Sequence, residues 1–278
     1  MTIEFFCPRW GSEHIPWRAF LQSVKDAGYA GIEWFPFGEV CNHQHVLKLL
    51  KEYELEFVIV MAVLQHYAKL EEYLAELEKQ LTWLCKLETH NQRPLFITAQ
   101  TGREYFSAHQ VEETLLCCKK VSEQFNVPIH HETHRNKWTY AAHAVSPFLF
   151  KHDDLILTLD ISHWFCVSES YLHDQHETVA EAIKHTRHIH ARVGHIEGPQ
   201  VWDPAIPEYA EALNEHLKVW DMYIKQRKAS GAFYCTITPE FGPPPYMVFA
   251  NRQGSPHEEQ WRINLWMKNL LEKRYANI

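Results

Sequence analysis

The sequence predicts a single-domain α/β protein, a (β/α)8 barrel in which eight parallel strands are enclosed by helices. Eight short apolar runs are spread along the 278 residues. The segments between several of these runs repeat their apolar residues at helical spacing. Strand followed by helix, repeated without two adjacent strands, is typical of parallel βαβ units, and eight such units close into a barrel.

The apolar runs are the predicted strands. Several are rich in Ile, Val and Phe, which is typical of strands buried on both faces. They cover residues 2–7, 31–34, 57–63, 94–99, 127–132, 155–161, 187–192 and 233–238. Apolar side chains recur at helical spacing in 17–27 and 70–81, less regularly in 111–121, and again in an amphipathic segment over 258–275.

The length of the chain fits one large domain, and α/β barrels of this size form single units. No linker, low-complexity tract or internal repeat divides the sequence, so the predicted domain spans residues 1–278. A doubly wound open sheet is the structural alternative. It is disfavoured because the candidate ligands follow four consecutive strands, whereas open sheets gather their ligands at one switch point.

Composition narrows the class of protein. An apolar content of 46% with 22% charged residues is typical of a protein with a substantial core. A formal net charge of −8, spread along the chain, disfavours nucleic acid as a partner. The seven cysteines include no C-x-x-C pair, which favours reduced thiols in a cytosol. Without a signal-like start or an apolar run of membrane-spanning length, we expect a cytoplasmic protein with no membrane partner.

Four acidic or imidazole side chains stand at the ends of consecutive predicted strands: Glu132, Asp160, His190 and Glu240. In a parallel barrel the carboxyl ends of the strands converge on one face, so residues far apart in sequence can share one ion. A carboxylate buried there needs a cation or hydrogen-bond donors to stay charged. The sequence therefore predicts one divalent metal site at the mouth of the barrel.

Two further side chains are predicted to face the same pocket. His163 follows Asp160 by three residues, on the first turn after the strand, and Arg192 shares a strand face with His190. The arginine could clamp a substrate oxygen or carboxylate. The structural alternatives are a satisfied core histidine and an ion pair between Arg192 and an acid such as Glu197. His130 and His134, on either side of Glu132, are interpreted as supporting residues.

Aromatic residues near the strand ends offer a surface for a sugar ring. Trp10, Trp34, Phe35, Trp164 and Phe241 could stack on its apolar face. Packing of the barrel rim explains the same residues equally well. Trp10 is kept as a candidate substrate-binding residue.

With these residues the chain resembles the xylose isomerase-like TIM barrel superfamily, the sugar phosphate isomerase and epimerase group that also includes endonuclease IV. The resemblance rests on Glu132, the Asp160-x-x-His163 pair, His190 as the second histidine of H-x-H, and Glu240. These positions span about half the chain, and the eight-unit pattern extends the likeness over all of it. The fold implied is a (β/α)8 TIM barrel.

The resemblance also implies roles for individual residues. A single divalent ion, manganese, magnesium, cobalt or zinc, would be bound by Glu132, Asp160, His190 and Glu240. His163 and Arg192 would contact the substrate. His66, after the third strand, is a further candidate and could supply an extra ligand of the endonuclease kind. The Asp-x-His of that branch is missing, since Asp203 is followed by Pro and Ala, so nuclease activity is disfavoured.

The predicted reaction is proton transfer next to a carbonyl in a sugar or sugar-derived polyol. The ion would chelate adjacent substrate oxygens and stabilise an enediolate. Glu132 and Glu240 come from non-neighbouring strands, so one could remove a proton and the other return it. This arrangement suits an isomerase or epimerase.

The sequence is compatible with three other functions. Loss of a β-hydroxyl from the same enediolate would make the protein a dehydratase of a keto-sugar or inosose. A phosphodiesterase like endonuclease IV and a non-catalytic sugar-binding barrel are further alternatives. No Gly-rich phosphate loop occurs, so a substrate without phosphate is favoured. A homo-oligomer is compatible with exposed aromatic residues at the rim but is not required by them.

Overall fold

The strands close into a barrel in sequence order. In the computed structural model, which describes residues 1–88, 92–248 and 254–277, each strand pairs in parallel with its neighbours, and β1 pairs with β8 to complete the ring. The strands are β1 (Thr2–Pro8), β2 (Gly31–Trp34), β3 (Glu56–Ala62), β4 (Ile97–Gln100), β5 (Ile129–Glu132), β6 (Leu157–Leu159), β7 (Thr186–His190) and β8 (Tyr234–Thr238). The predicted fold class is confirmed.

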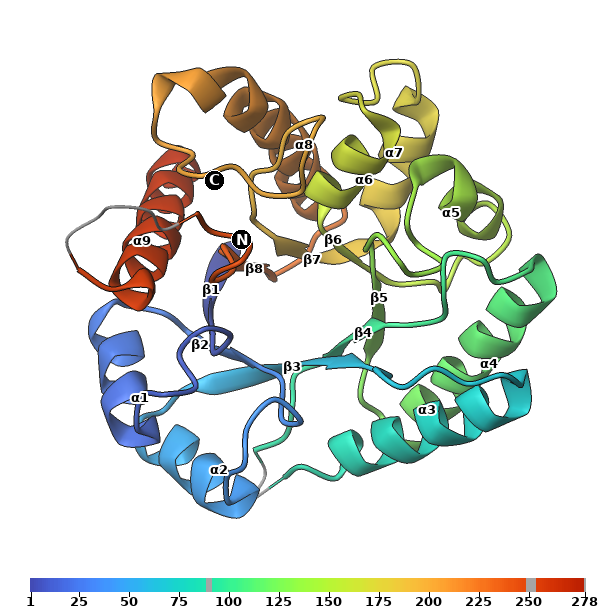
Figure 1. The fold of residues 1–278 in the computed structure, drawn as a ribbon, viewed down its shortest axis with the longest axis horizontal. Helices are drawn as coiled ribbons and strands as arrows, with labels where there is room; N and C mark the ends of the chain where they lie inside the picture. The colour runs from blue at the N-terminus through green and yellow to red at the C-terminus, as the bar shows by residue number, and fades with distance from the viewer. Residues whose placement is uncertain (89–91, 249–253, 278) are drawn as a thin grey trace.

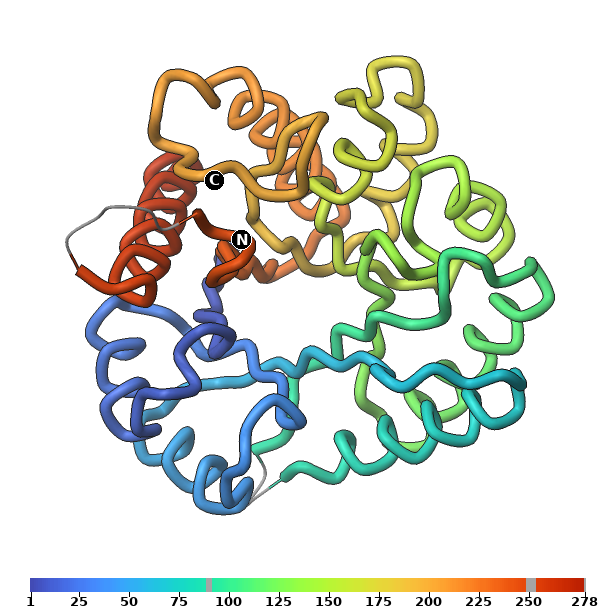
Figure 2. The backbone as a smooth tube through the Cα atoms, viewed as in Figure 1, coloured from blue at the N-terminus to red at the C-terminus, as the bar shows by residue number. Residues whose placement is uncertain are grey.

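Helices surround the barrel on all sides, and the chain passes once around the ring from β1 to the last helix (Figures 1 and 2). The α-helices are α1 (Trp17–Asp26), α2 (His43–Glu52), α3 (Leu70–Cys85), α4 (Ala108–Phe125), α5 (Ala142–Leu149), α6 (Ile161–Ser168), α7 (His176–His185), α8 (Ala210–Ala229) and α9 (Pro256–Arg274), with a 3₁₀ turn at Pro207–Tyr209. None of the helices in the described ranges is long and apolar enough to cross a membrane.

The predicted strand bounds differ from the observed ones mainly at β6, which is shorter than the predicted 155–161. The reason is local. Asp160 leaves the strand and caps α6, where its carboxylate accepts a hydrogen bond from the Ser162 backbone N–H at 3.0 Å. The predicted run 187–192 likewise ends as a strand at His190, so Arg192 lies in the loop beyond β7.

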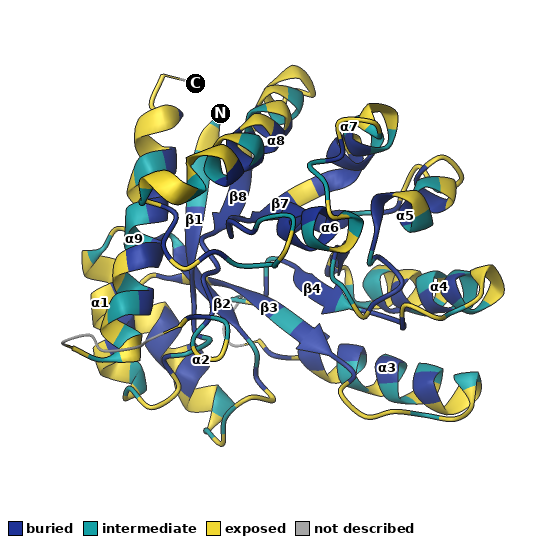
Figure 3. Cartoon of the chain, turned by 45° about the horizontal axis from the view of Figure 1, so that its top comes forward, coloured by how far each residue is buried: buried dark blue, intermediate teal, exposed yellow. Residues whose placement is uncertain are grey.

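The interior of the barrel changes from apolar to polar along its axis. Phe6, Val58 and Phe96 form a small cluster separate from the main core between strands and helices. The His130 ring stacks on Phe96 with centroids 4.2 Å apart, and His188 packs on the same phenyl ring at 5.0 Å. Strands are buried and the outer faces of the helices are exposed (Figure 3). The apolar cluster therefore seals one end, and the polar side chains gather toward the other.

Candidate metal centre

The four predicted ligands converge at the carboxyl ends of the strands. Glu132 is the last residue of β5, His190 is the last residue of β7, and Asp160 and Glu240 follow β6 and β8. All four are buried. Ligand atoms of Asp160, His190 and Glu240 lie within 4.8 Å of one another. The His190 Nδ1 is 3.2 Å from Glu240 Oε2 and 3.7 Å from Glu132 Oε1.

These side chains fit a divalent cation. The His190 Nδ1 is fully enclosed and makes no hydrogen bond, and its nearest polar neighbours are carboxylate oxygens. In the neutral imidazole its lone pair can accept a metal ion, which would take the place of the ring proton. Carboxylate oxygens with one imidazole are ligands that Mg²⁺, Mn²⁺, Co²⁺ and Zn²⁺ accept. Both oxygens of Asp160 already accept hydrogen bonds, Oδ1 from Ser162 and Oδ2 from Arg192. A bound ion would share Oδ2 with the arginine or replace it there.

Burial is the largest influence on the pKa values of the cluster, and neighbouring charges of both signs modify it. Burial raises the pKa of Glu132, and the nearby Glu240 and Asp160 carboxylates raise it further, against the opposing effect of His190. Burial also raises the pKa of Asp160, although Arg192 opposes this shift. The pKa of His190 would fall through burial, but Glu240 and Glu33 hold it well above its usual range. A cation at this point would relieve the repulsion among the carboxylates.

Glu33 is a member of the cluster that the sequence analysis missed. It lies within β2, is 3% exposed, and its Oε2 is 2.9 Å from His190 Nε2. The Thr238 hydroxyl donates to the same oxygen at 3.2 Å, and His188 Nε2 is 3.3 Å away. With Nε2–H donated to Glu33, His190 keeps the tautomer whose Nδ1 can bind an ion. The available signal was an acid inside the apolar run 31–34.

Arg192 and His163 are in contact, but only Arg192 lines the cavity, and His163 is fully buried behind it. The Arg192 Nη2 is 2.7 Å from His163 Nε2, and Arg135 Nη1 is 3.2 Å from His163 Nδ1. A neutral imidazole has one acceptor nitrogen, so only one of these contacts can be a hydrogen bond at a time. Burial and the neighbouring His134 and Arg192 hold the pKa of His163 well below its usual range. Arg192 pairs with Asp160, and not with the alternative partner Glu197.

A cavity of about 380 Å³ opens at this end of the barrel. One wall is apolar and comes from the first three βα units: Pro8, Trp10, Phe35, Val60, Ala62 and Leu64. The other wall is polar: Glu33, Gln100, Glu132, His134, Arg192, Glu240 and Tyr246. Trp10 lines the cavity, and its contact with substrate stays a prediction.

Four predicted positions lie elsewhere. Trp34, Trp164 and Phe241 are buried and pack in the core, and none of them lines the cavity. His66 is exposed in the loop between β3 and α3 and does not line the cavity. Leu64, two residues earlier, is the side chain of that loop that reaches the cavity, and the sequence carries no signal for how the loop turns.

Sequence reasoning also missed a bridge across the mouth. The Arg135 Nη2 donates to the Tyr246 hydroxyl at 2.9 Å, and Tyr246 packs edge-on against Trp10 with centroids 5.4 Å apart. These residues come from the loops after β5, β8 and β1. Together they cover part of the cavity and join its polar and apolar walls.

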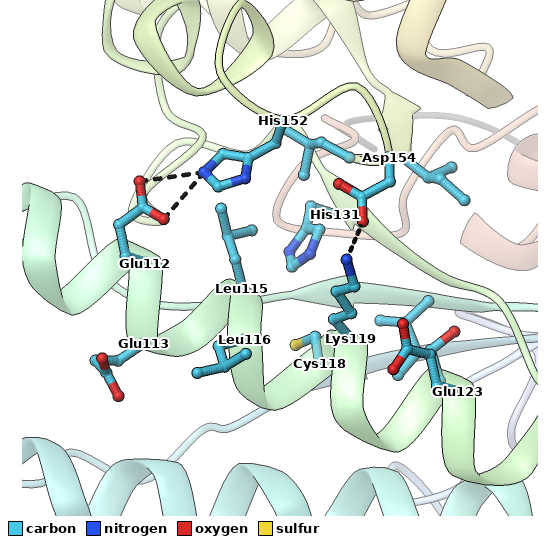
Figure 4. A pocket seen from close by; sticks show the side chains of 14 residues that line it. Glu112, Glu113, Leu115, Leu116, Cys118, Lys119, Glu123, His131, His152 and Asp154 are labelled. Atoms are coloured by element: carbon cyan, nitrogen blue, oxygen red, sulfur yellow. Dashed lines mark hydrogen bonds and ion pairs between the residues drawn. The ribbon is translucent and has the colours of Figure 1, made fainter.

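A second cavity, of about 480 Å³, lies outside the barrel beside α4. Four of its charged side chains form two pairs, Glu112 with His152 and Lys119 with Asp154, whereas Glu113 and Glu123 form no ion pair with the described residues there (Figure 4). The Cys118 and His131 side chains between them are buried, and burial lowers the pKa of His131 to about 4. Among the described residues, the clusters of His, Asp and Glu that could hold a metal ion lie at the mouth of the barrel and not in this cavity, so the mouth is the better candidate for a reactive site.

Comparisons with known proteins agree with this architecture. By sequence, no protein-family model and no curated protein matches the chain. By structure, the probable 3-DHS dehydratase AsbF from Bacillus anthracis matches 98% of this chain over 99% of its own, with a TM-score of 0.62 and 19% identity. The chain has the xylose isomerase-like TIM barrel fold. The resemblance inferred from sequence is thereby confirmed at the level of fold.

Other solved structures with this fold carry the names of enzymes with different reactions. The 3-keto-D-glucoside 4-epimerase YcjR from E. coli is 12% identical, with 96% of this chain and 100% of that one covered and a TM-score of 0.62. Endonuclease IV from Thermus thermophilus is 13% identical, with 98% and 100% covered and a TM-score of 0.60. The fold is therefore compatible with several reactions, and only the residues of the site can indicate which one this protein catalyses.

Proposed function

We propose that this protein is a divalent-metal-dependent isomerase or epimerase that moves a proton next to the carbonyl of a sugar or sugar-derived polyol. The observation that carries the proposal is the enclosed His190 Nδ1, which makes no hydrogen bond and lies among the carboxylates of Glu132, Asp160 and Glu240. The 3-keto-D-glucoside 4-epimerase and a D-psicose 3-epimerase from Clostridium cellulolyticum share the fold and support this choice.

Glu132, Asp160, His190 and Glu240 would hold one manganese, magnesium, cobalt or zinc ion. The ion would supply positive charge to adjacent substrate oxygens and so stabilise an enediolate. Glu132 and Glu240 reach the cavity from β5 and from beyond β8, and we assign them the removal and return of the proton. Gln100 Nε2 donates to both Glu132 oxygens at 3.1 Å and fixes the orientation of that carboxylate.

The remaining side chains of the cavity would bind and orient the substrate. Arg192 is 2% exposed and lines the cavity, so its guanidinium can donate to a substrate oxygen. Trp10 and the apolar wall would pack on the carbon skeleton and exclude water. His163 would act through Arg192, which it contacts.

A dehydratase acting on a keto-polyol is the second candidate. One of the two carboxylates would remove the proton from carbon, and the β-hydroxyl would leave as water with a proton from the other, in place of reprotonation of the carbon. The apolar wall favours this alternative, because it suits a flat product with fewer hydroxyl groups. The fold match with the probable 3-DHS dehydratase supports it as well.

Metal content is the first test. We expect the purified protein to contain about one equivalent of a divalent metal by plasma mass spectrometry, and we expect Glu240→Ala to lose it. Solvent deuterium exchange into a panel of ketoses, followed by NMR, would then identify a substrate, and loss of water would reveal a dehydratase. A wild-type protein that neither contains nor takes up metal would contradict the proposal. Metal-dependent nicking of abasic DNA would support the phosphodiesterase alternative instead.

Glu33→Gln is expected to weaken metal binding by roughly 10- to 100-fold, the usual effect of changing the hydrogen-bond partner of a ligating histidine. The neutral amide would no longer stabilise the Nε2–H of His190 as a carboxylate does. Manganese titration followed by electron paramagnetic resonance measures the change. Glu39→Gln is the control, because Glu39 pairs with Arg9 and does not contact the cluster. Equal affinity in wild type and Glu33→Gln would rule out this role.

A further inference from the structure

Two buried cations near the cavity form no direct ion pair with a carboxylate of the described residues. Lys137 is 5% exposed, and its ammonium makes no hydrogen bond or ion pair with the residues that the structure describes. Arg103 is 7% exposed and donates to neutral oxygens, at 3.2 Å to the Val63 carbonyl and at 3.1 Å to Asn136 Oδ1. Burying a charge without a counter-ion is unfavourable, so both positions call for a functional explanation.

Both cations lie behind the same edge of the cavity, next to residues that line it. Lys137 lies in the loop after β5, five residues beyond Glu132, and it interacts electrostatically with Glu132, His134, Arg103 and the exposed Glu104. Glu132 and His134 line the cavity. Arg103 also contacts the carbonyl of Leu64, another lining residue. The Lys137 Nζ is not among the enclosed polar atoms that lack a partner, so it opens onto solvent-accessible space.

The charge balance of the mouth points to an anionic ligand. Its four buried carboxylates are Glu33, Glu132, Asp160 and Glu240, and its three buried cationic side chains are Arg103, Lys137 and Arg192. One half-buried cation, Arg135, and one exposed acid, Glu104, lie beside them. A divalent ion bound to a neutral His190 would therefore leave an excess of positive charge in an enclosed space, which attracts anions.

Building on the proposed function, we propose that Lys137, with Arg103 beside it, binds a carboxylate of the substrate, which is then a sugar acid or an acidic cyclic polyol and not a neutral sugar. The Lys137 ammonium has three donors and no acceptor among the described side chains. A single free ammonium suits a singly charged carboxylate. The oxygens that accept hydrogen bonds from Arg103 are uncharged, so they hold its guanidinium in place and do not neutralise its positive charge.

The test is calorimetric titration of the manganese-loaded protein with matched acidic and neutral compounds at millimolar concentration. The pairs are D-gluconate and D-glucitol, D-galacturonate and D-galactose, and quinate and myo-inositol. We expect the acid to bind more tightly in at least one pair. Lys137→Met should weaken binding of that acid by about tenfold and leave the neutral compound unaffected, as loss of one charge-assisted hydrogen bond predicts.

Controls separate this inference from the proposed function. Lys151→Met is the matched control, because Lys151 is exposed and pairs with Glu112 on the outer surface, and it should keep the preference for acids. Lys137→Arg should retain part of the preference, and Lys137→Gln is the second variant if the methionine variant does not fold. Manganese content should equal that of wild type in all of them. Failure to bind manganese in wild type would reject the proposed function.

Two results would overturn the inference alone. One is a manganese-loaded wild type in which no acid binds more tightly than its neutral partner. The other is a preference for acids that survives in Lys137→Met and in Lys137→Gln. In either case Lys137 and Arg103 would not bind a carboxylate of the substrate.

Discussion

Glu132→Gln is expected to lower the rate of metal-dependent proton exchange by about 10²- to 10⁴-fold, the range that a positioned general base contributes. The amide keeps the shape of the side chain but cannot accept the proton. Glu240→Gln should have an effect of similar size. Deuterium exchange into the identified substrate, followed by NMR at saturating manganese, measures both variants.

Glu132 and Glu240 are also proposed ligands, so the metal content of each variant has to be determined together with its rate. A glutamine variant that retains the ion and loses exchange would support proton transfer by that side chain. Glu197→Gln is the control, because Glu197 is an exposed acid in the loop after β7. If both Glu132→Gln and Glu240→Gln exchanged protons at the wild-type rate with metal bound, the acid and base assignment would be wrong.

The parts of the site that the sequence predicted are those fixed by topology. Glu132, Asp160, His190 and Glu240 each follow a recognisable strand, and parallel closure brings all strand ends to one face. That step needs no knowledge of side-chain packing. The barrel itself was predictable for the same reason, since the alternation of strand and helix is a local pattern repeated along the chain.

The parts that escaped prediction depend on contacts between distant residues. Glu33 resembles an ordinary strand acid until His190, 157 residues away, is placed at 2.9 Å from it. The contact between Arg135 and Tyr246 joins loops 111 residues apart. The exposure of His66 depends on how the loop after β3 turns. No local periodicity encodes these pairings, so only the folded structure shows them.

The burial of Lys137 could not be predicted from the sequence for a different reason. Nothing in its sequence neighbourhood marks it, because a lysine in a loop after a strand is normally solvated. The structure buries it, and burial together with the Arg103 charge lowers its pKa to about 8 from 10.5. A protein maximising stability would not keep an unpaired cation there. Its presence is best explained by a role in binding, which accords with the tendency of functional sites to reduce stability.

Because burial of the Lys137 ammonium is unfavourable, Lys137→Met is expected to be more stable than wild type at neutral pH, by about 1–3 kcal/mol in the free energy of unfolding. The lowered pKa means that the folded state holds the Lys137 proton less tightly than the unfolded state does. Protonated lysine therefore destabilises the fold at pH 7, and methionine removes that destabilisation while filling similar space. Urea unfolding of the metal-free proteins, followed by circular dichroism, measures the difference.

The pH dependence gives the sharper test of the same prediction. Between pH 8 and 10.5 the unfolded chain keeps the Lys137 proton and the folded protein releases it, so the stability of wild type rises with pH relative to Lys137→Met. The difference in the free energy of unfolding between Lys137→Met and wild type should be constant below about pH 8 and should disappear by about pH 10.5. Lys151→Met, at an exposed lysine, should show no such dependence. A difference independent of pH would mean that packing, and not charge, separates Lys137→Met from wild type.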